Sequence, residues 1–400
     1  MSFAQLGEWS QLHVSAQVVW VADLVCLIGA LVTLYVLYRH ARAPRVALAG
    51  AAVPAGGEAE ARSATSGTTF LERLPTVLMY GSLVVLAGWV WVRWQETNHF
   101  PSQTMSEVLT MFTLALVISM VVLHHVLALH RRSNGWAVVD DALMLLIFAS
   151  VVYTHVHVRT LVTAQRDLPP ALQSYWFPPH LSSLIFSYAT LGIAGLIALI
   201  YFSTRFWSGF FQGGYSRRSQ WWVFLGLVLI PFAHFVTIPV LAITGLVFLV
   251  LHKRGRLPSR DTVAALEKEL DQVSFRAFAV GIPFLTAGLW MGAFWAQEAW
   301  ANYWGWDSKE NSALISWLIY IVYIHLRMLG GYRGEKAMAV LLGGALSIFL
   351  TFQVFGYLPD SQKSLHRYTD DGVVPQEGQQ GAVPTEEAAK LEGGAGEASR

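Results

Sequence analysis

Residues 14–38 read VSAQVVWVADLVCLIGALVTLYVLY, a long apolar run with one charged residue, Asp23. A helix needs about 20 apolar residues to cross a hydrocarbon core of about 30 Å. Comparable runs recur along the chain, and the fold they predict is all-α, a polytopic transmembrane bundle of about eight spanning helices. We expect these helices near 15–38, 76–95, 105–129, 136–157, 180–203, 275–296, 311–329 and 336–357.

The composition agrees with a membrane protein. Apolar residues make up 54% of the 400 residues and charged residues only 13%, whereas a soluble domain carries about a quarter charged residues. The formal net charge of +1 offers no basic face, so we expect no nucleic acid partner. The single cysteine, Cys26, cannot form a redox pair or a thiolate cage, and we interpret it as a small buried hydrophobe.

Basic residues in the short connections predict the orientation, because Lys and Arg accumulate on the cytoplasmic side. The connections 96–104, 158–179 and 297–310 are poor in them and are expected to face outward, with both termini. The basic, cytoplasmic set is Arg39, Arg42, Arg45, Arg62, Arg73, Arg131, Arg132, Arg205, Arg217, Arg218, Lys253, Arg254, Arg256, Arg260, Lys268, Arg327, Arg333 and Lys336.

Two stretches depart from simple spans. Residues 220–251 must enter and leave from the same face and are too short for two crossings, so we expect a short hairpin or re-entrant pair there. Residues 259–275 carry apolar side chains on one helical face and charges on the other, which predicts an interfacial helix on the cytoplasmic surface or a solvated connector.

Composition also divides the chain into three parts. Residues 1–75 comprise an N-terminal membrane helix, with no cleavable signal pattern before it, and a flexible linker rich in Ala, Gly, Ser and Thr. Residues 76–369 form the main membrane domain. Residues 370–400 have almost no aromatic or β-branched side chains and are expected to be a disordered tail.

The most informative stretch for function is the aromatic segment, residues 290–310, which reads WMGAFWAQEAWANYWGWDSKE. Its aromatic residues are Trp290, Phe294, Trp295, Trp300, Tyr303, Trp304 and Trp306. Tryptophan at a membrane interface is ordinary, but this density beside charged residues also suits a platform for a flat apolar ligand that bears carboxylates. The residues alone leave both interpretations open.

The string WAQEAWANYWGWDSKENSALISWLIYIVYIHLR, which begins at Trp295, closely resembles the "WWD" signature of the CcsA/ResC cytochrome c assembly proteins. These belong to a wider haem-handling family with CcmC and CcmF. Three further segments are similar to parts of that family: NHFPSQTMSEVL at 98–109, ALQSYWFPPHLSSLIFSYA at 171–189 and FQVFGYLPDSQKSLHRY at 352–368. The resemblance therefore extends over most of the chain.

The resemblance implies a set of haem-binding residues. His180 and His366 match the outer-face pair of axial ligands to haem iron, and His325 matches a membrane histidine that would take haem from the cytoplasmic side. The tryptophan platform and its acidic neighbour are Trp295, Trp300, Trp304, Trp306 and Asp307. The ligand implied is haem b, and the partners are apocytochrome c and a CcsB/ResB-type membrane protein.

This sequence departs from the family pattern at Ser308, which stands where the family usually has proline, and at Asn311–Ser312, which replace a Thr-Trp pair. We expect Ser308 to cap the following helix in place of the proline.

Other histidines carry weaker expectations. His124 and His125 are adjacent on a helix and cannot both face the bundle interior. His155 and His157 are expected at the outer interface, and His234 is a candidate pocket residue. The resemblance includes His99 and Glu107 without assigning either a role.

Three functions follow as hypotheses. The first is the membrane subunit of a holocytochrome c synthase in a bacterial cytoplasmic membrane, which holds haem at an outer-face platform for thioether attachment to apocytochrome CxxCH motifs. The second is a haem carrier or exporter of the CcmC type without ligase activity. The third is a transporter of something other than haem, with the tryptophans serving as an interfacial belt.

Overall fold

The computed structural model describes residues 13–42, 70–125, 134–158, 168–213 and 234–353. This part of the chain contains nine α-helices, one short 3-10 helix and no strand, which confirms the predicted all-α class. The elements are α1 (Val14–Arg42), α3 (Phe70–Thr97), α4 (Met105–His125), α5 (Asn134–Val158), η4 (Pro170–Gln173), α6 (Phe177–Gln212), α8 (His234–Lys253), α9 (Arg260–Trp300), α10 (Ser308–Met328) and α11 (Glu335–Gln353).

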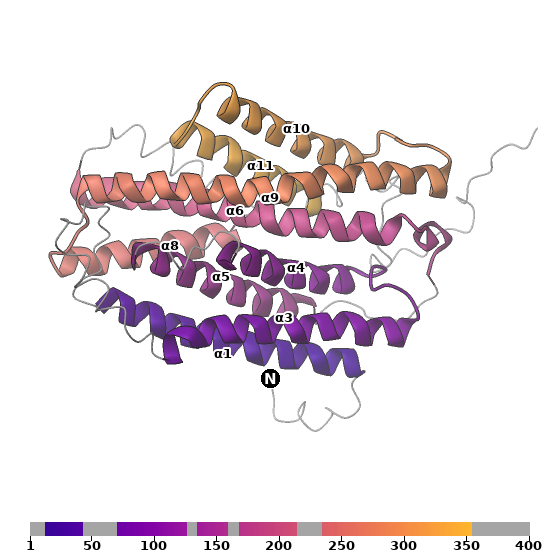
Figure 1. The fold of residues 1–400 in the computed structure, drawn as a ribbon, viewed down its shortest axis with the longest axis horizontal. Coiled ribbons are helices and arrows are strands. Elements are labelled where there is room, and N and C mark those ends of the chain that lie inside the picture. The colour runs from indigo at the N-terminus through magenta and orange to yellow at the C-terminus, as the bar shows by residue number, and fades with distance from the viewer. Residues whose placement is uncertain (1–12, 43–69, 126–133, 159–167, 214–233, 354–400) are drawn as a thin grey trace, which may run out of the picture.

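The helices lie side by side in one bundle (Figure 1). α1 and α3 form one edge, α4 and α5 follow, α6 pairs with α9 near the centre, and α10 with α11 forms the opposite edge. Among the described residues, six helices are long and apolar enough to cross a membrane: α1, α3, α4, α5, α6 and α9. A buried core extends through the whole set and includes Cys26, which is 0% exposed, as predicted.

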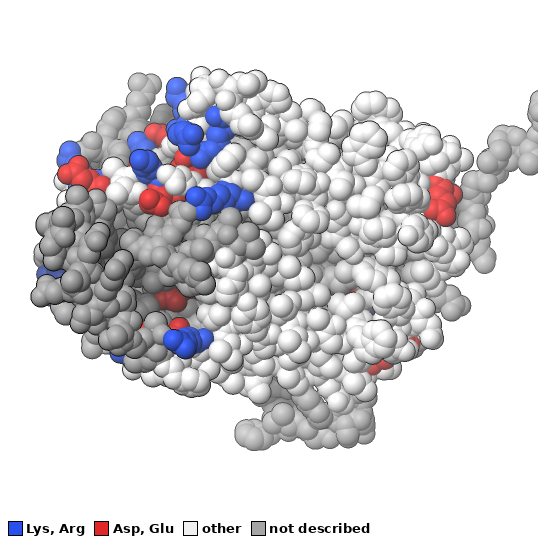
Figure 2. All heavy atoms as spheres, in the orientation of Figure 1, with Lys and Arg blue, Asp and Glu red and all other residues white. Residues whose placement is uncertain are grey.

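The two ends of the bundle differ in charge (Figure 2). Lys and Arg gather toward the end where α6 and α10 finish and α9 begins. Polar contacts hold this end together: Gln212 donates to the carbonyl of Pro258, and Arg205 pairs with Glu335 at 2.9 Å. The aromatic segment lies at the opposite end, where α1 starts and α11 finishes. We call these the basic end and the aromatic end.

The region between α6 and α9 supports the prediction that the chain enters and leaves 220–251 at one face. The end of α6 and the start of α9 meet at the basic end. α8 runs parallel to the last third of α6, since Ser203 contacts Thr244 and, further along, Phe211 contacts His252. α8 therefore begins part-way along the bundle and ends at the basic end. Residues 220–233 of the predicted hairpin, and the side chain of His234, lie outside the described residues.

The separate interfacial helix predicted at 259–275 is wrong, because these residues form the first turns of the 41-residue helix α9. The apolar face was predicted correctly, and Val263, Leu270 and Val273 are buried. That face packs against the bundle instead of lying on a membrane surface.

A buried ion pair joins α9 to α10 at the basic end. The guanidinium of Arg327 donates to both carboxylate oxygens of Asp271, at 2.7 and 2.9 Å, and the backbone N–H of Gly334 also donates to Asp271 at 3.1 Å. The side chains of Arg327 and Asp271 are 3% and 4% exposed. The pair thus fixes the turn between α10 and α11 against α9.

Candidate functional site

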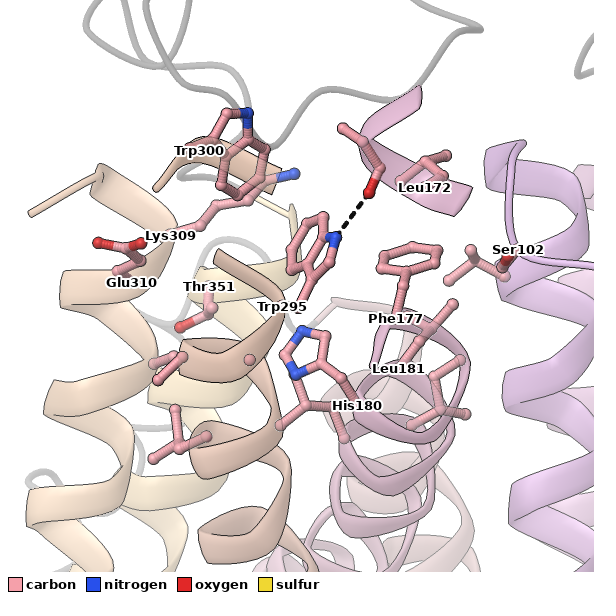
Figure 3. A pocket seen from close by; sticks show the side chains of 18 of the residues that line it. Ser102, Leu172, Phe177, His180, Leu181, Trp295, Trp300, Lys309, Glu310 and Thr351 are labelled. Carbon is pink, nitrogen blue, oxygen red and sulfur yellow. Dashed lines mark hydrogen bonds between the residues drawn. The ribbon is translucent and has the colours of Figure 1, made fainter. Parts of the chain in front are cut away.

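A cavity of about 260 Å³ lies at the aromatic end, between α4, η4, α6, α9 and α10 (Figure 3). Its walls are mainly aromatic and aliphatic, which suits an apolar ligand. The residues that line it are Ser102, Gln103, Val108, Pro169, Ala171, Leu172, Phe177, His180, Leu181, Leu184, Ile185, Tyr188, Leu289, Gly292, Ala293, Trp295, Trp300, Tyr303, Trp304, Lys309, Glu310, Ala313 and Thr351.

His180 is the histidine of this cavity. It lies in the first turn of α6, which begins at Phe177, and directly follows Pro178 and Pro179, whose fixed φ angles suit the start of a helix. Its Nδ1 lies 2.8 Å from the carbonyl oxygen of Gly288 on α9. A carbonyl only accepts, so Nδ1 carries the hydrogen and Nε2 of the neutral ring carries the lone pair. This is the usual arrangement of a metal-binding imidazole.

The close approach of α9 to His180 depends on Gly292. A Cβ added there would lie 2.6 Å from Cε1 of His180, closer than two such atoms can pack. The ring also stacks on Trp295, with centroids 5.5 Å apart and planes at 26°. The position of the imidazole is therefore set from two sides by α9.

Gly292→Ala is expected to weaken binding of any ligand coordinated by His180 about 10-fold to 100-fold, the range typical when a group that orients a metal ligand is disturbed. Alanine favours the helix by about 1 kcal/mol, which offsets part of the roughly 1–3 kcal/mol that displacing a packed ring costs. A spectroscopic titration with haem measures the change in affinity. Gly343→Ala is the matched control, because a Cβ on that helical glycine meets nothing within 4 Å. Equal affinity in the two variants would contradict the role of Gly292.

The four predicted platform tryptophans occupy different environments. Trp295 is 4% exposed and donates to the carbonyl of Ala171 at 2.7 Å, so it forms part of the cavity wall. Trp300 packs against it, with centroids 4.8 Å apart, and lines the cavity together with Trp304. Trp306 is 72% exposed, lies outside the lining set and has φ of 56°.

Asp307 caps the start of α10, a role that was predicted for its neighbour Ser308. Its carboxylate accepts from the N–H of Lys309 at 2.7 Å, and Glu310 reaches back to the N–H of Asp307 at 3.2 Å. This capping box begins α10. The prediction that Ser308 caps the helix is wrong, because Asp307 is the N-cap; the buried hydroxyl of Ser308 has no hydrogen-bond partner among the described residues.

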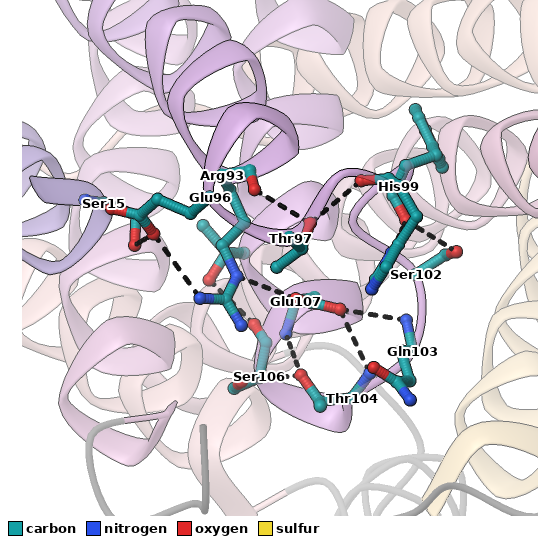
Figure 4. Close-up of polar contacts among 12 residues, drawn as sticks. Ser15, Arg93, Glu96, Thr97, His99, Ser102, Gln103, Thr104, Ser106 and Glu107 are labelled. Atoms are coloured by element: carbon teal, nitrogen blue, oxygen red, sulfur yellow. Dashed lines mark hydrogen bonds and ion pairs between the residues drawn. The ribbon is translucent and has the colours of Figure 1, made fainter. Parts of the chain in front are cut away.

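The wall opposite α10 is held by a polar network around Glu107 (Figure 4). Glu107 is 2% exposed and accepts from Arg93 at 2.8 Å and from the N–H groups of Gln103 and Thr104 at 2.9 and 3.2 Å. It thereby fixes the loop 98–104, whose Ser102 and Gln103 line the cavity. Glu107, whose role the sequence left open, positions the wall of the site.

His325 and His366 are not part of the described cavity. His325 is exposed on α10 near the basic end, with its Nδ1 2.7 Å from the carbonyl of Ile321. His366 lies outside the described residues. Thr351, close to the end of α11, lines the cavity, so the described chain ends near this site, 13 positions before His366.

Two other histidines form buried pairs. His124 contacts Asp140 at 2.7 Å and is 5% exposed, whereas His125 is exposed, as their adjacency requires. The prediction that His155 is interfacial is wrong: it is 0% exposed. His157 is exposed.

His155 is bound through both ring nitrogens. Nδ1 lies 2.7 Å from Asp23, and Nε2 lies 3.0 Å from the hydroxyl of Thr113, which itself donates to a backbone carbonyl. Both nitrogens are occupied, so His155 is not available to a metal in this arrangement. Asp23, a charge within an apolar run, was the sequence signal for such a site.

Taken together, these features define a polytopic helical membrane protein with an aromatic, histidine-containing cavity at the end opposite the one where Lys and Arg gather. The chain belongs to the cytochrome c assembly protein family, whose model matches residues 105–359. Cytochrome c assembly is therefore the process in which it acts.

Several similar proteins are described as cytochrome c biogenesis protein CcsA. The chain is 29% identical over 283 residues to the cytochrome c biogenesis protein CcsA of Marchantia polymorpha, covering 69% of this chain and 81% of that protein. It is 27% identical over 310 residues to CcsA of Gloeobacter violaceus, covering 74% and 87%. Identity to CcsA of Chlamydomonas reinhardtii is 28% over 282 residues, covering 70% of this chain and 64% of that protein. The resemblance inferred from the aromatic segment is thus confirmed.

Proposed function

We propose that this chain binds haem b in the cavity at the aromatic end and presents it for covalent attachment to apocytochrome c. The observation that carries the proposal is the hydrogen bond from His180 Nδ1 to Gly288, because it places the lone pair on Nε2 within an aromatic cavity. Iron coordinated by an imidazole, with tryptophan faces against the macrocycle, is an ordinary way to hold haem.

Two further histidines extend the proposal. His366 supplies the second axial ligand; an extended segment spans about 3.3 Å per residue, so 13 residues from the end of α11 are ample to reach the cavity. His325, whose Nδ1 is likewise held by a carbonyl, takes haem near the basic end. Basic residues favour the cytoplasmic side, so the basic end is cytoplasmic and the cavity opens outward.

The chemical step is the addition of a thiol S–H across each haem vinyl C=C bond. A C–S bond forms, the hydrogen goes to the other vinyl carbon, and nothing is released. Both thiols come from the CxxCH motif of apocytochrome c. The chain's contribution is to hold the ring in place, since proximity and orientation lower the barrier of a bimolecular step. In this proposal the chain is a synthase subunit and acts with a CcsB/ResB-type partner.

A co-expression experiment distinguishes the proposed synthase subunit from a haem carrier without ligase activity. The full chain is produced with its CcsB/ResB-type partner and an apocytochrome reporter, in cells that lack other assembly systems. We expect covalent haem on the reporter with the wild type and none with His180→Ala. Haem bound to the chain without covalent product would instead favour the carrier. A purified chain that binds no haem would favour the transporter with an aromatic belt.

A further inference from the structure

Glu107 lies in the first turn of α4 and takes part in a capping box with Thr104. The N–H of Thr104 donates to the carboxylate of Glu107 at 3.2 Å, and the N–H of Glu107 donates to the hydroxyl of Thr104 at 3.3 Å. Glutamate is almost never fully buried unless it is paired, and Glu107 is 2% exposed. Capping a helix does not require such burial, so the carboxylate has a further role.

Arg93, near the end of α3, supplies the positive charge that this burial requires. Its Nε donates to Oε1 of Glu107 at 2.8 Å, and its side chain is 8% exposed. The N–H groups of Gln103 and Thr104 donate to the other oxygen, Oε2. The carboxylate therefore joins α3 through one oxygen to the loop 98–104 through the other, as Figure 4 shows.

The guanidinium of Arg93 is also held from the side of α1. Its Nη1 donates to Glu96 at 3.5 Å. Glu96 in turn accepts from the backbone N–H of Ser15, at 2.9 Å, and from its hydroxyl. Ser15 lies in the first turn of α1, where a negative charge is favourable. Polar contacts therefore run without a break from α1 to the loop 98–104, and Arg93 links the two carboxylates.

The loop at the end of this network forms a wall of the cavity. Ser102 and Gln103 line the cavity, and each is 3% exposed. Arg93 and Glu107 are not among the lining residues. Charge-assisted hydrogen bonds are roughly twice as strong as neutral ones, and a buried carboxylate without a cation is unfavourable. The guanidinium therefore strengthens the bonds that hold this wall without touching the cavity.

We propose that Arg93 is a positioning residue for haem, which acts through Glu107 on the wall formed by the loop 98–104. The inference rests on the proposed function, because haem is the ligand whose fit against this wall the network sets. Iron coordination comes from His180 on α6, so loosening the wall should weaken binding without changing the ligand of the iron.

The test is a double-variant cycle of haem affinity, measured by spectroscopic titration of the full-length purified chain. Arg93→Met removes the charge, and Glu107→Gln replaces the carboxylate with an amide. We expect each single variant to weaken haem binding about tenfold, the difference between hydrogen bonds to a charged and to a neutral group. The double variant should also lose about tenfold instead of about 100-fold, because residues that act as one unit are not additive. Arg93→Lys keeps the charge and should retain more affinity than Arg93→Met.

Two measurements separate positioning from a general loss of structure. The spectrum of histidine-ligated haem should be the same in every variant, because His180 is unchanged. Cys26 is the only cysteine of the chain and is 0% exposed on α1, so its reaction with a thiol reagent reports opening of the bundle. We expect the wild-type rate in each variant. Arg93→Gln replaces Arg93→Met in the cycle if the methionine variant does not fold.

Arg205→Met is the matched control. Arg205 also contacts two glutamates, Glu335 at 2.9 Å and Glu267 at 3.5 Å, but it lies at the basic end, so haem affinity should equal that of the wild type. Wild-type affinity in Arg93→Met, additive losses in the double variant, or lost affinity together with faster labelling of Cys26 would overturn the role of Arg93 while leaving haem binding through His180 intact. Failure of the wild type to bind haem would instead overturn the proposed function, and the positioning role with it.

Discussion

His180→Ala is expected to lower the affinity of the chain for haem about 100-fold or more, which corresponds to about 2.8 kcal/mol. The variant removes the nitrogen lone pair that the hydrogen bond to Gly288 leaves on Nε2. The apolar walls remain, so weak residual binding without the histidine-ligated spectrum should persist. Added imidazole should restore part of the absorption, because it can occupy the space of the missing ring.

His157→Ala is the control for this variant, since His157 is exposed on α5 and lies outside the cavity lining. Its haem affinity and spectrum should match the wild type. Normal haem retention and normal holocytochrome yield in His180→Ala would show that His180 is not a haem ligand.

Asp271→Ala should destabilise the folded chain by about 3–5 kcal/mol, the usual cost of leaving one partner of a buried ion pair alone. The substitution leaves the guanidinium of Arg327 buried without its carboxylate partner, beside the carbonyl of Asp271, the hydroxyl of Tyr323 and the Phe275 ring, 4.4 Å from Cζ. It also removes the acceptor for the N–H of Gly334. The free energy of unfolding in mixed micelles, followed by circular dichroism, measures the change.

A double variant separates the lost ion pair from a general loss of packing. Replacing both Asp271 and Arg327 with leucine should recover most of the stability, because a buried pair can be exchanged for apolar side chains at little cost. Haem affinity per folded molecule should be retained, since the pair lies at the basic end and the cavity at the other. A decrease of less than about 1 kcal/mol in the free energy of unfolding of Asp271→Ala would show that the buried ion pair does not stabilise the fold.

Six of the described helices could be predicted from sequence because their apolar runs are long enough to span a membrane. The continuity of α9 could not be predicted. Charged residues at 260–271 suggested a separate surface helix, but no Gly or Pro interrupts residues 260–280, and Ala, Leu, Glu and Lys all favour helix. The helix therefore continues, with Asp271 satisfied by Arg327 from another element.

The aromatic segment was predictable as a group but not residue by residue. Trp295 is buried and Trp306 exposed because α9 ends between them, at Ala301 in the left-handed region with φ of 55°. Composition does not reveal that turn. The capping box could have been predicted from sequence, because Asp307 followed three positions later by Glu310 is a known pattern at the start of a helix. The pairing of Asp23 with His155 could not have been predicted, because the two residues are 132 positions apart.

The visible spectrum of the full-length purified chain, oxidised and reduced, is the decisive test of haem ligation by His180. We expect a Soret band, with the sharp bands of low-spin haem on reduction, that is present in the wild type and lost in His180→Ala. A wild-type chain with no Soret band after incubation with haem, or a spectrum identical in the two proteins, would contradict it.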